Sequence, residues 1–130
     1  MNIPENLKYT KTDEWVKVEV KIATVGLTDY AQHQLSDIVY VEITPTKGET
    51  VKKNTSCATV ESVKAAADVN LPVSGKVLEV NESLSSTPEV INLDPYGKAW
   101  IVKLELSNVG EVTELMDAKA YEIYCQGRSH

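Results

Sequence analysis

Short stretches of alternating apolar and polar residues, ended by Gly, Pro or Asn, dominate this chain and limit what it can fold into. The clearest, Trp15-Val16-Lys17-Val18-Glu19-Val20, alternates as a half-buried strand does. Further strands are predicted at Ile22–Val25, Ile38–Ile43, Cys57–Val60, Val69–Leu71, Lys76–Val80 and Trp100–Leu106. Because these strands are short and closely spaced, the pattern favours an all-β sandwich or small barrel over a parallel sheet with crossover helices.

Only short helices are predicted. Thr28 is expected to cap a helix over residues 29–35, and Thr87 to cap one or two turns that begin with Pro88 and Glu89. Near the end, apolar side chains recur at helical spacing at Val112, Leu115 and Met116, and again at Tyr121, Tyr124 and Cys125, with Asp117 as a cap between. These signals predict a C-terminal helical hairpin, over about 108–125, laid on the sheet.

Length and charge narrow the class of protein. A chain of 130 residues predicts a single domain over 1–130 with one sizeable core. The net charge is -6, and no basic stripe with interleaved aromatic residues is present, which argues against nucleic acid and anionic membrane as partners. The first fifteen residues resemble neither a secretory nor a mitochondrial address. The expected location is the cytoplasm of a bacterium, or the mitochondrial matrix if a transit peptide has been removed.

Cysteine and histidine are too sparse for a metal centre. Cys57 and Cys125 are the only cysteines and form no CxxC, so two free, partly buried thiols in a reducing cytoplasm are expected. His33 and His130 are the only histidines and lie far apart in sequence. No metal site is therefore predicted.

The most informative segment runs from Gly48 to Val80 and has Lys64 in its middle. Gly48 precedes Lys64 by sixteen positions and Gly75 follows it by eleven, and both are expected at turns that need a positive φ. Asn54 is expected to take a left-handed conformation in a further turn. The stretch ESVKAAA must hold a tight reversal, at the tip of a hairpin over about 56–71, and its alanines leave the lysine uncrowded.

A lysine at a hairpin tip suits a covalent carrier, because an amide at its ε-nitrogen creates a long swinging arm. The residues alone leave alternatives open. A lone lysine in an Ala-rich turn is most simply an ordinary solvated side chain of an interaction module. An enzyme that forms a Schiff base at Lys64 would need a buried lysine or a nearby cation, neither of which a hairpin tip favours.

The stretch ESVKAAAD, residues 61–68, resembles the lipoylation motif of the glycine cleavage H-protein family. The similarity extends to YTKTDEWV near the start, IATVGLTDYAQHQLSDIVYVEI, VNESLSSTPEVINLDPYGKAWIVKLEL and MDAKAYEIYC. Together these cover nearly the whole chain in the family's order. The resemblance implies a barrel-sandwich hybrid, a flattened barrel of two antiparallel sheets, with short helices that include a C-terminal helix.

The resemblance also implies roles for particular residues. Lys64 would carry the lipoyl group as an amide, and Glu61 would help the lipoylating enzymes recognise the hairpin. In the family the loaded arm swings back into a cleft that shields its aminomethyl group, and the matching positions here are Thr12, Glu14, Gln34 and Asp68. Carboxylates at two of these positions would pair with the ammonium of the cargo.

Three positions depart from the family's pattern. Asp13 stands where many members have His, Gln34 stands where some members have His, and Asn54 replaces a usual Gly. His33 is adjacent to Gln34.

Members of this family are carriers and not enzymes. The implied partners are the glycine decarboxylase (P protein), the aminomethyltransferase (T protein), the dihydrolipoyl dehydrogenase (L protein) and the lipoylating enzymes, and the implied cofactor is covalent lipoate. The main alternative is a lipoyl relay that hands the group to 2-oxoacid dehydrogenase complexes. A biotin carrier is disfavoured, because Val63-Lys64-Ala65 stands where such carriers have Met-Lys-Met.

Overall fold

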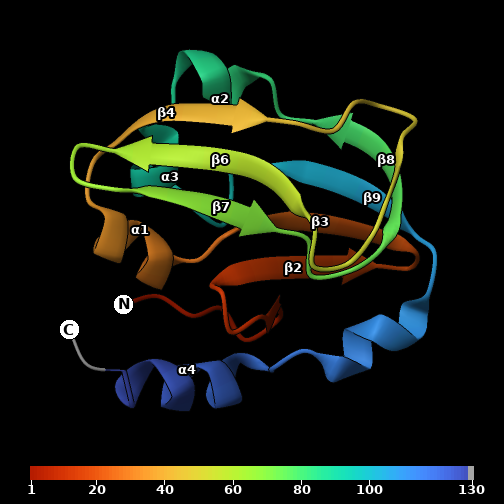
Figure 1. Cartoon of the computed structure of the whole chain (residues 1–130). Coiled ribbons are helices and arrows are strands. Elements are labelled where there is room, and N and C mark those ends of the chain that lie inside the picture. The colour runs from red at the N-terminus through yellow and green to blue at the C-terminus, as the bar shows by residue number, and fades with distance from the viewer. Residues whose placement is uncertain (129–130) are drawn as a thin grey trace.

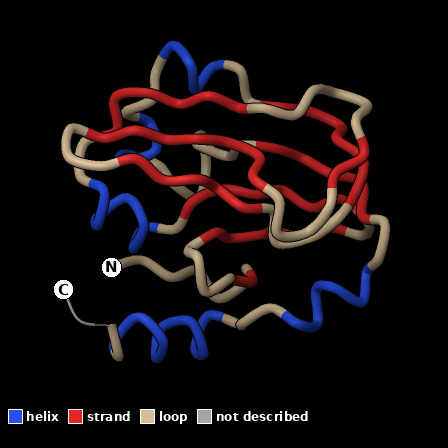
Figure 2. Tube along the Cα trace, viewed as in Figure 1, coloured by secondary structure: helices blue, strands red, loops and turns tan. Residues whose placement is uncertain are grey.

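The computed structural model describes residues 1–128 and consists of two antiparallel sheets flanked by short helices (Figure 1). Ser129 and His130 lie outside the described residues, so the prediction that His130 binds no metal is not addressed. The six-stranded sheet has the order β1-β2-β3-β9-β8-β5. The three-stranded sheet has the order β4-β6-β7. Figure 2 shows the strands as two layers, with helices along the edges and the lower side. The predicted all-β class is confirmed.

The strands and helices have the following bounds. The larger sheet contains β1 (Lys8–Tyr9), β2 (Glu14–Glu19), β3 (Ile22–Leu27), β5 (Thr50–Val51), β8 (Gly75–Val80) and β9 (Val102–Leu106). The smaller contains β4 (Ile38–Ile43), β6 (Ser56–Ser62) and β7 (Ala66–Asn70). The helices are α1 (Asp29–Leu35), α2 (Ser83–Ser86), α3 (Val90–Leu93), the 3-10 helix η1 (Val109–Glu114) and α4 (Ala118–Gln126). All seven predicted strands are present; Ile38–Ile43 has the predicted bounds, and the other six are shifted at one or both ends. The pattern missed β1 and β5, since two residues show no periodicity.

The main core fills the space between the inner faces of the two sheets. It is built from the alternate residues of each strand, as the pleat requires, and includes Val16, Val25, Val60, Val77 and Leu104. In the smaller sheet Val41, Val60 and Ala67 form one inward-facing row across the three strands. The outward-facing row beside it contains Glu42, Thr59 and Asp68. The smaller sheet therefore buries one face and exposes a polar one.

A second, aromatic cluster joins α4 to the outer face of the larger sheet. Tyr9 and Tyr121 stack with ring centroids 4.6 Å apart, and Trp15 and Cys125 pack in the same cluster. Met116 exchanges two backbone hydrogen bonds with Tyr9, which fixes the segment before α4 against β1. The position of α4 is thus set by contacts with residues more than a hundred positions earlier in the chain.

The predicted helices are partly confirmed. Helix α1 has the expected bounds, and the Thr28 side chain caps it by accepting a hydrogen bond from the Ala31 N–H. The prediction for Thr87 is wrong, because Thr87 ends α2 and Glu89 caps α3. The C-terminal helical hairpin is also wrong. Val109–Glu114 is a 3-10 helix that precedes α4, and the two run along one side of the molecule without folding back on each other (Figure 1). The bridge between Met116 and Tyr9 keeps the intervening chain extended.

The glycine predictions have mixed outcomes. Gly48 has φ 93° and Asn54 has φ 72°, so both left-handed turns are confirmed. Gly75 does not have a positive φ and is the first residue of β8. A Cβ at Gly75 would lie 2.3 Å from the carbonyl oxygen of Glu105 on β9. Glycine is required here because β9 approaches closely, and not because of the backbone conformation.

These two glycines should therefore respond differently to alanine. We expect Gly75→Ala to lower the free energy of unfolding by about 3 kcal/mol, because the methyl group must push β8 away from β9. Gly48→Ala meets open space and should lower it by only about 1 kcal/mol, the strain of a left-handed alanine. Urea denaturation of both variants checks the ranking. A larger loss for Gly48→Ala than for Gly75→Ala would contradict it.

Candidate functional site

Lys64 lies in the turn that joins β6 to β7, at one end of the smaller sheet (Figure 1). The turn is held by Ser62. Its N–H donates to the Ala65 carbonyl at 2.8 Å, and its Oγ accepts from the N–H groups of Lys64 and Ala65 at 3.2 and 3.0 Å. The Val63 N–H donates to the carbonyl of Asp37, which fixes the turn against the segment before β4. The tip is thus a rigid reversal, as the sequence predicted.

The Lys64 side chain is exposed, and within residues 1–128 no hydrogen bond or ion pair involves its amine. Ala65 and Ala66 beside it are also exposed. This position gives an approaching enzyme free access to the nitrogen. It does not suit a Schiff-base lysine that depends on burial.

Glu61 lies on the outer face of the smaller sheet, directly before the turn. It is exposed and faces Tyr40 on β4 and Ala66 on β7. Asp68 lies two residues along β7 from Ala66 and accepts a hydrogen bond from the Thr59 hydroxyl at 3.3 Å. Both carboxylates therefore face solvent, and each lies within four residues of Lys64 in the sequence.

Glu14 is different, because its side chain is only 1% exposed. Its Oε1 accepts hydrogen bonds from the hydroxyls of Thr10 and Thr12, both at 2.6 Å. Its Oε2 accepts from the main-chain N–H of Asn70 at 3.1 Å, which ties the start of β2 to the end of β7. Burial raises the pKa of the Glu14 carboxyl, while these three hydrogen bonds act in the opposite direction. Burying an ionisable acid lowers the free energy of unfolding. Acids of this kind are found most often at functional sites.

The cost of burying Glu14 can be measured against pH. Its pKa is raised in the folded state, so this carboxyl favours folding below the ordinary pKa of Glu, about 4.3, and loses that contribution as pH rises through the folded value. Because the variant has no ionisable group at this buried position, the free energy of unfolding of Glu14→Gln should rise relative to that of wild type between pH 4 and pH 8. Denaturant titrations at several pH values test this. A variant that becomes less stable than wild type as pH rises would reverse the sign.

The structure brings some of the predicted cleft residues together and not others. Thr12 contacts Glu14 directly, and Asp68 lies two positions from Asn70, the main-chain partner of Glu14. No hydrogen bond joins Gln34 to either acid within residues 1–128. Gln34 instead lines a hollow of about 480 Å³ with the following residues: Met1, Tyr30, His33, Cys125, Gln126 and Arg128.

Three residues of this region were missed from the sequence. Thr10 and Asn70 hold the Glu14 carboxylate, and Ser62 orders the turn beside Lys64. A signal existed for Ser62, since Ser two residues before a turn position commonly bonds the following N–H groups. Asn70 acts through its main chain, so no residue type could have marked it.

Asp13, a departure from the family's pattern, has a structural partner. It has φ 74°, and its carboxylate accepts two hydrogen bonds from the guanidinium of Arg128 at 2.6 and 2.9 Å. The Tyr121 hydroxyl donates to the same carboxylate at 2.9 Å. The turn before Glu14 is therefore fastened to α4.

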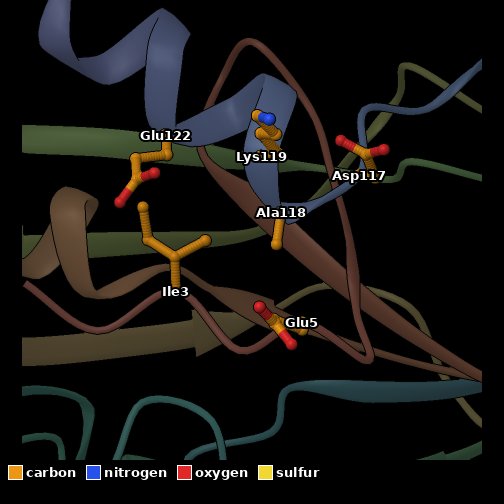
Figure 3. A pocket seen from close by; sticks show the side chains of 6 residues that line it. All are labelled: Ile3, Glu5, Asp117, Ala118, Lys119 and Glu122. Carbon is orange, nitrogen blue, oxygen red and sulfur yellow. The ribbon is translucent and has the colours of Figure 1, made fainter.

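The remaining features lie away from the hairpin tip. Figure 3 shows a hollow of about 390 Å³ in which Ile3 and Glu5 face the first turns of α4, and none of its lining residues belongs to β6 or β7. Cys57 and Cys125 are free and buried, as expected, and burial raises the pKa of the Cys57 thiol to about 12. Among the described residues, no helix combines the length and apolar character needed to cross a membrane.

Comparisons with known proteins agree with this geometry. The family model described as "Glycine cleavage H-protein" matches residues 7–128. A glycine cleavage system H protein of Thermotoga maritima is 55% identical over 118 residues, covering 91% of this chain and 94% of its own. A mitochondrial one of Arabidopsis thaliana is 49% identical, covering 94% and 78%. The crystal structure of a glycine cleavage system H protein from Mycobacterium marinum superposes with a TM-score of 0.83 at 35% identity, covering 92% and 95%. This chain belongs to the glycine cleavage H-protein family.

Proposed function

We propose that Lys64 carries a lipoyl group through an amide, and that the chain serves as the lipoyl carrier of the glycine cleavage system. The observation that carries this proposal is the exposed lysine at the tip of a rigid hairpin, in a chain of this family. Lipoate supplies the dithiolane chemistry when it is attached. The protein supplies a fixed root for the arm, access to the amine, and a surface on which the arm can rest.

The edge of β7 supports a resting place for the arm. Strand β7 is the edge of its sheet, and Ala65 and Leu71 bond toward the β6 side. By alternation, Ala66, Asp68 and Asn70 turn their main-chain polar groups away from β6. An extended lysine with a lipoyl chain spans roughly 14 Å, about four residues of a strand at about 3.4 Å each. An arm folded back along this edge therefore ends near Asp68, beside the main-chain partner of Glu14.

Three side chains at that point suit a cationic cargo. Asp68 is exposed, and the Thr12 hydroxyl already lies 2.6 Å from the Glu14 carboxylate. Thr12 is exposed and Thr10 is half-buried, so an ammonium would reach the Glu14 carboxylate from the side of Thr12, whose hydroxyl oxygen can accept from it, and would leave Thr10 in place. We therefore propose that Thr12, Glu14 and Asp68 hold the aminomethyl cargo away from water. Gln34, on α1, is proposed to act after the arm has folded back.

The partners follow from the same role. A carrier brings its arm to other active sites, so the protein is not itself a catalyst. Its arm would be loaded by the glycine decarboxylase, unloaded by the aminomethyltransferase and reoxidised by the dihydrolipoyl dehydrogenase, after lipoylating enzymes that recognise Glu61 have attached it. The proposed location is the cytoplasm of a bacterium, or the mitochondrial matrix after removal of a transit peptide.

Peptide mapping of natively expressed protein tests the proposal most simply. A lipoyl mass increment should appear on the peptide that contains Lys64 and on no other peptide. A biotinyl increment would indicate a different carrier, and an increment on another lysine would overturn the assignment. Protein left unmodified after incubation with lipoate, ATP and a lipoate ligase would overturn it as well.

A further inference from the structure

The segment before β2 is a tight turn that carries two of the proposed cargo-binding side chains. The Thr10 N–H donates to the Glu14 carbonyl at 3.0 Å, and the Glu14 N–H donates to the Thr10 hydroxyl at 3.0 Å. Because that hydroxyl accepts from the main chain, its own proton points to the Glu14 carboxylate. The orientation of the Glu14 side chain therefore depends on the conformation of residues 10–14.

This turn includes a backbone conformation that does not hold itself. Asp13 has φ 74°, in the left-handed region that side chains other than glycine adopt at a cost. Within the turn the Asp13 N–H donates to the Thr10 carbonyl at 3.2 Å, and further contacts come from outside the turn. The Asp13 carbonyl accepts from the Thr28 N–H at 3.0 Å, and its carboxylate accepts from Tyr121 and Arg128. The conformation is thus imposed by α1 and by the end of α4.

Arg128 is the strongest of these attachments. Its guanidinium makes a two-pronged contact with Asp13 and lies 4.2 Å from the ring centroid of Tyr30 and 4.9 Å from that of Tyr124. The side chains of Arg128 and Asp13 are 28% and 14% exposed, so solvent screens the pair only partly. Tyr124 adds a second tie, because its hydroxyl donates to the carbonyl of Lys11 in the same turn at 3.0 Å. A lysine at this position could neither make two parallel hydrogen bonds to the carboxylate nor stack a planar group on the tyrosine rings.

We propose that Arg128 is a positioning residue for cargo binding: through Asp13 it holds the turn 10–14 in the conformation that presents Thr12 and Glu14. This inference rests on the proposed function, in which those two side chains bind the cargo. Arg128 itself does not touch the cargo. The end of α4 supports the turn that carries the binding residues. Strand β7 and the lipoyl arm approach those residues from the other side.

The first test needs no lipoyl group. Amide hydrogen exchange of the full chain, followed by NMR, reports on the N–H groups of Glu14 and Asn70, which bond within this network. Arg128→Gln should speed exchange at both by about fivefold, since local opening controls exchange. The Val63 N–H at the hairpin tip should not change, and Arg128→Lys should lie between wild type and Arg128→Gln. The control Lys103→Gln removes the cation of a different ion pair, in which the Lys103 amine lies 3.9 Å from the Glu79 carboxylate, and should leave all three amides unchanged.

The second test uses lipoylated, loaded protein and separates this inference from the proposed function. Arg128→Gln should lose its aminomethyl cargo about threefold faster than wild type. In a Glu14→Gln background it should cause no further increase in the rate of loss, since both changes impair the same binding contact. One outcome would overturn only the role of Arg128: Glu14→Gln loses its cargo faster than wild type, while Arg128→Gln matches wild type both in cargo loss and in amide exchange. Wild-type loss from Glu14→Gln would overturn the binding site itself. Faster exchange at every amide of Arg128→Gln would mean a general loss of stability and would also contradict the inference.

Discussion

Replacing Lys64 with Arg should abolish lipoylation completely and leave the fold unchanged. Arginine keeps the positive charge, but its guanidinium does not act as the acyl-accepting amine. The turn around position 64 is held by the main chain and by Ser62, and in the described part of the chain the Lys64 amine bonds to nothing. No stabilising contact is therefore lost. Intact mass should show no lipoyl increment, and the melting temperature should match that of wild type.

The matched control is Lys76→Arg, an exposed lysine on β8 in the same region of the sequence. It should be lipoylated to the same extent as wild type. Lipoate found on Lys64→Arg, or on Lys76 of the wild type, would rule out the assignment. Full glycine cleavage activity of a system reconstituted with unmodified Lys64→Arg would do the same for the carrier role.

The second large effect is expected from the double variant Glu14→Gln, Asp68→Asn. It should still be lipoylated and reoxidised, because those steps use the arm extended from the hairpin. Once loaded, it should lose its cargo about tenfold or more faster, since a charge-assisted hydrogen bond in a partly desolvated site contributes about 1.5–3 kcal/mol. Loss consumes one water and yields formaldehyde and ammonium from the aminomethyl group, with the thiol restored on the arm.

First-order decay followed by intact mass, without the aminomethyltransferase, measures this directly. Most of the effect should come from Glu14→Gln, because Asp68 is exposed and its charge is screened. Glu42→Gln is the matched control, since it removes one exposed carboxylate from the same sheet in the row that contains Asp68. Equal decay of the double variant and wild type would make Glu14 a purely structural acid, and the lipoyl relay reading would then be favoured.

These results would connect stability with function at one residue. Glu14→Gln is expected to gain stability relative to wild type as pH rises, and yet to be a poorer protector of the cargo. Such opposition is typical of sites in which a buried charge is kept for its chemistry. A variant that gained stability and lost no protection would separate the two properties.

Local chemistry explains why so much of the hairpin was predictable. The reversal at ESVKAAA, the left-handed positions at Gly48 and Asn54, and the cap at Thr28 all depend on residues within a few positions of each other. Strand alternation is equally local, because the pleat has a period of two. The exposure of Lys64 follows from these features alone. The helix at Asp29–Leu35 was found for the same reason.

Other features depend on contacts between segments far apart in sequence, which no local pattern encodes. Gly75 is required by the carbonyl of Glu105, and not by its own φ. Glu14 is buried because Asn70, 56 positions away, closes over it through the main chain. The C-terminal segment stays extended before α4 because Met116 pairs with Tyr9.

The sequence by itself thus determined the all-β class, the hairpin and the lysine at its tip. Turn chemistry and a period-two pattern specify such features over a few residues. Only the tertiary structure decided which acid is buried, which threonines hold it, and that Arg128 reaches Asp13 across 115 positions. Those outcomes depend on which surfaces meet when the two sheets and α4 pack together. Packing selects among many possible pairings by excluding water and filling space, and a linear pattern does not contain that selection.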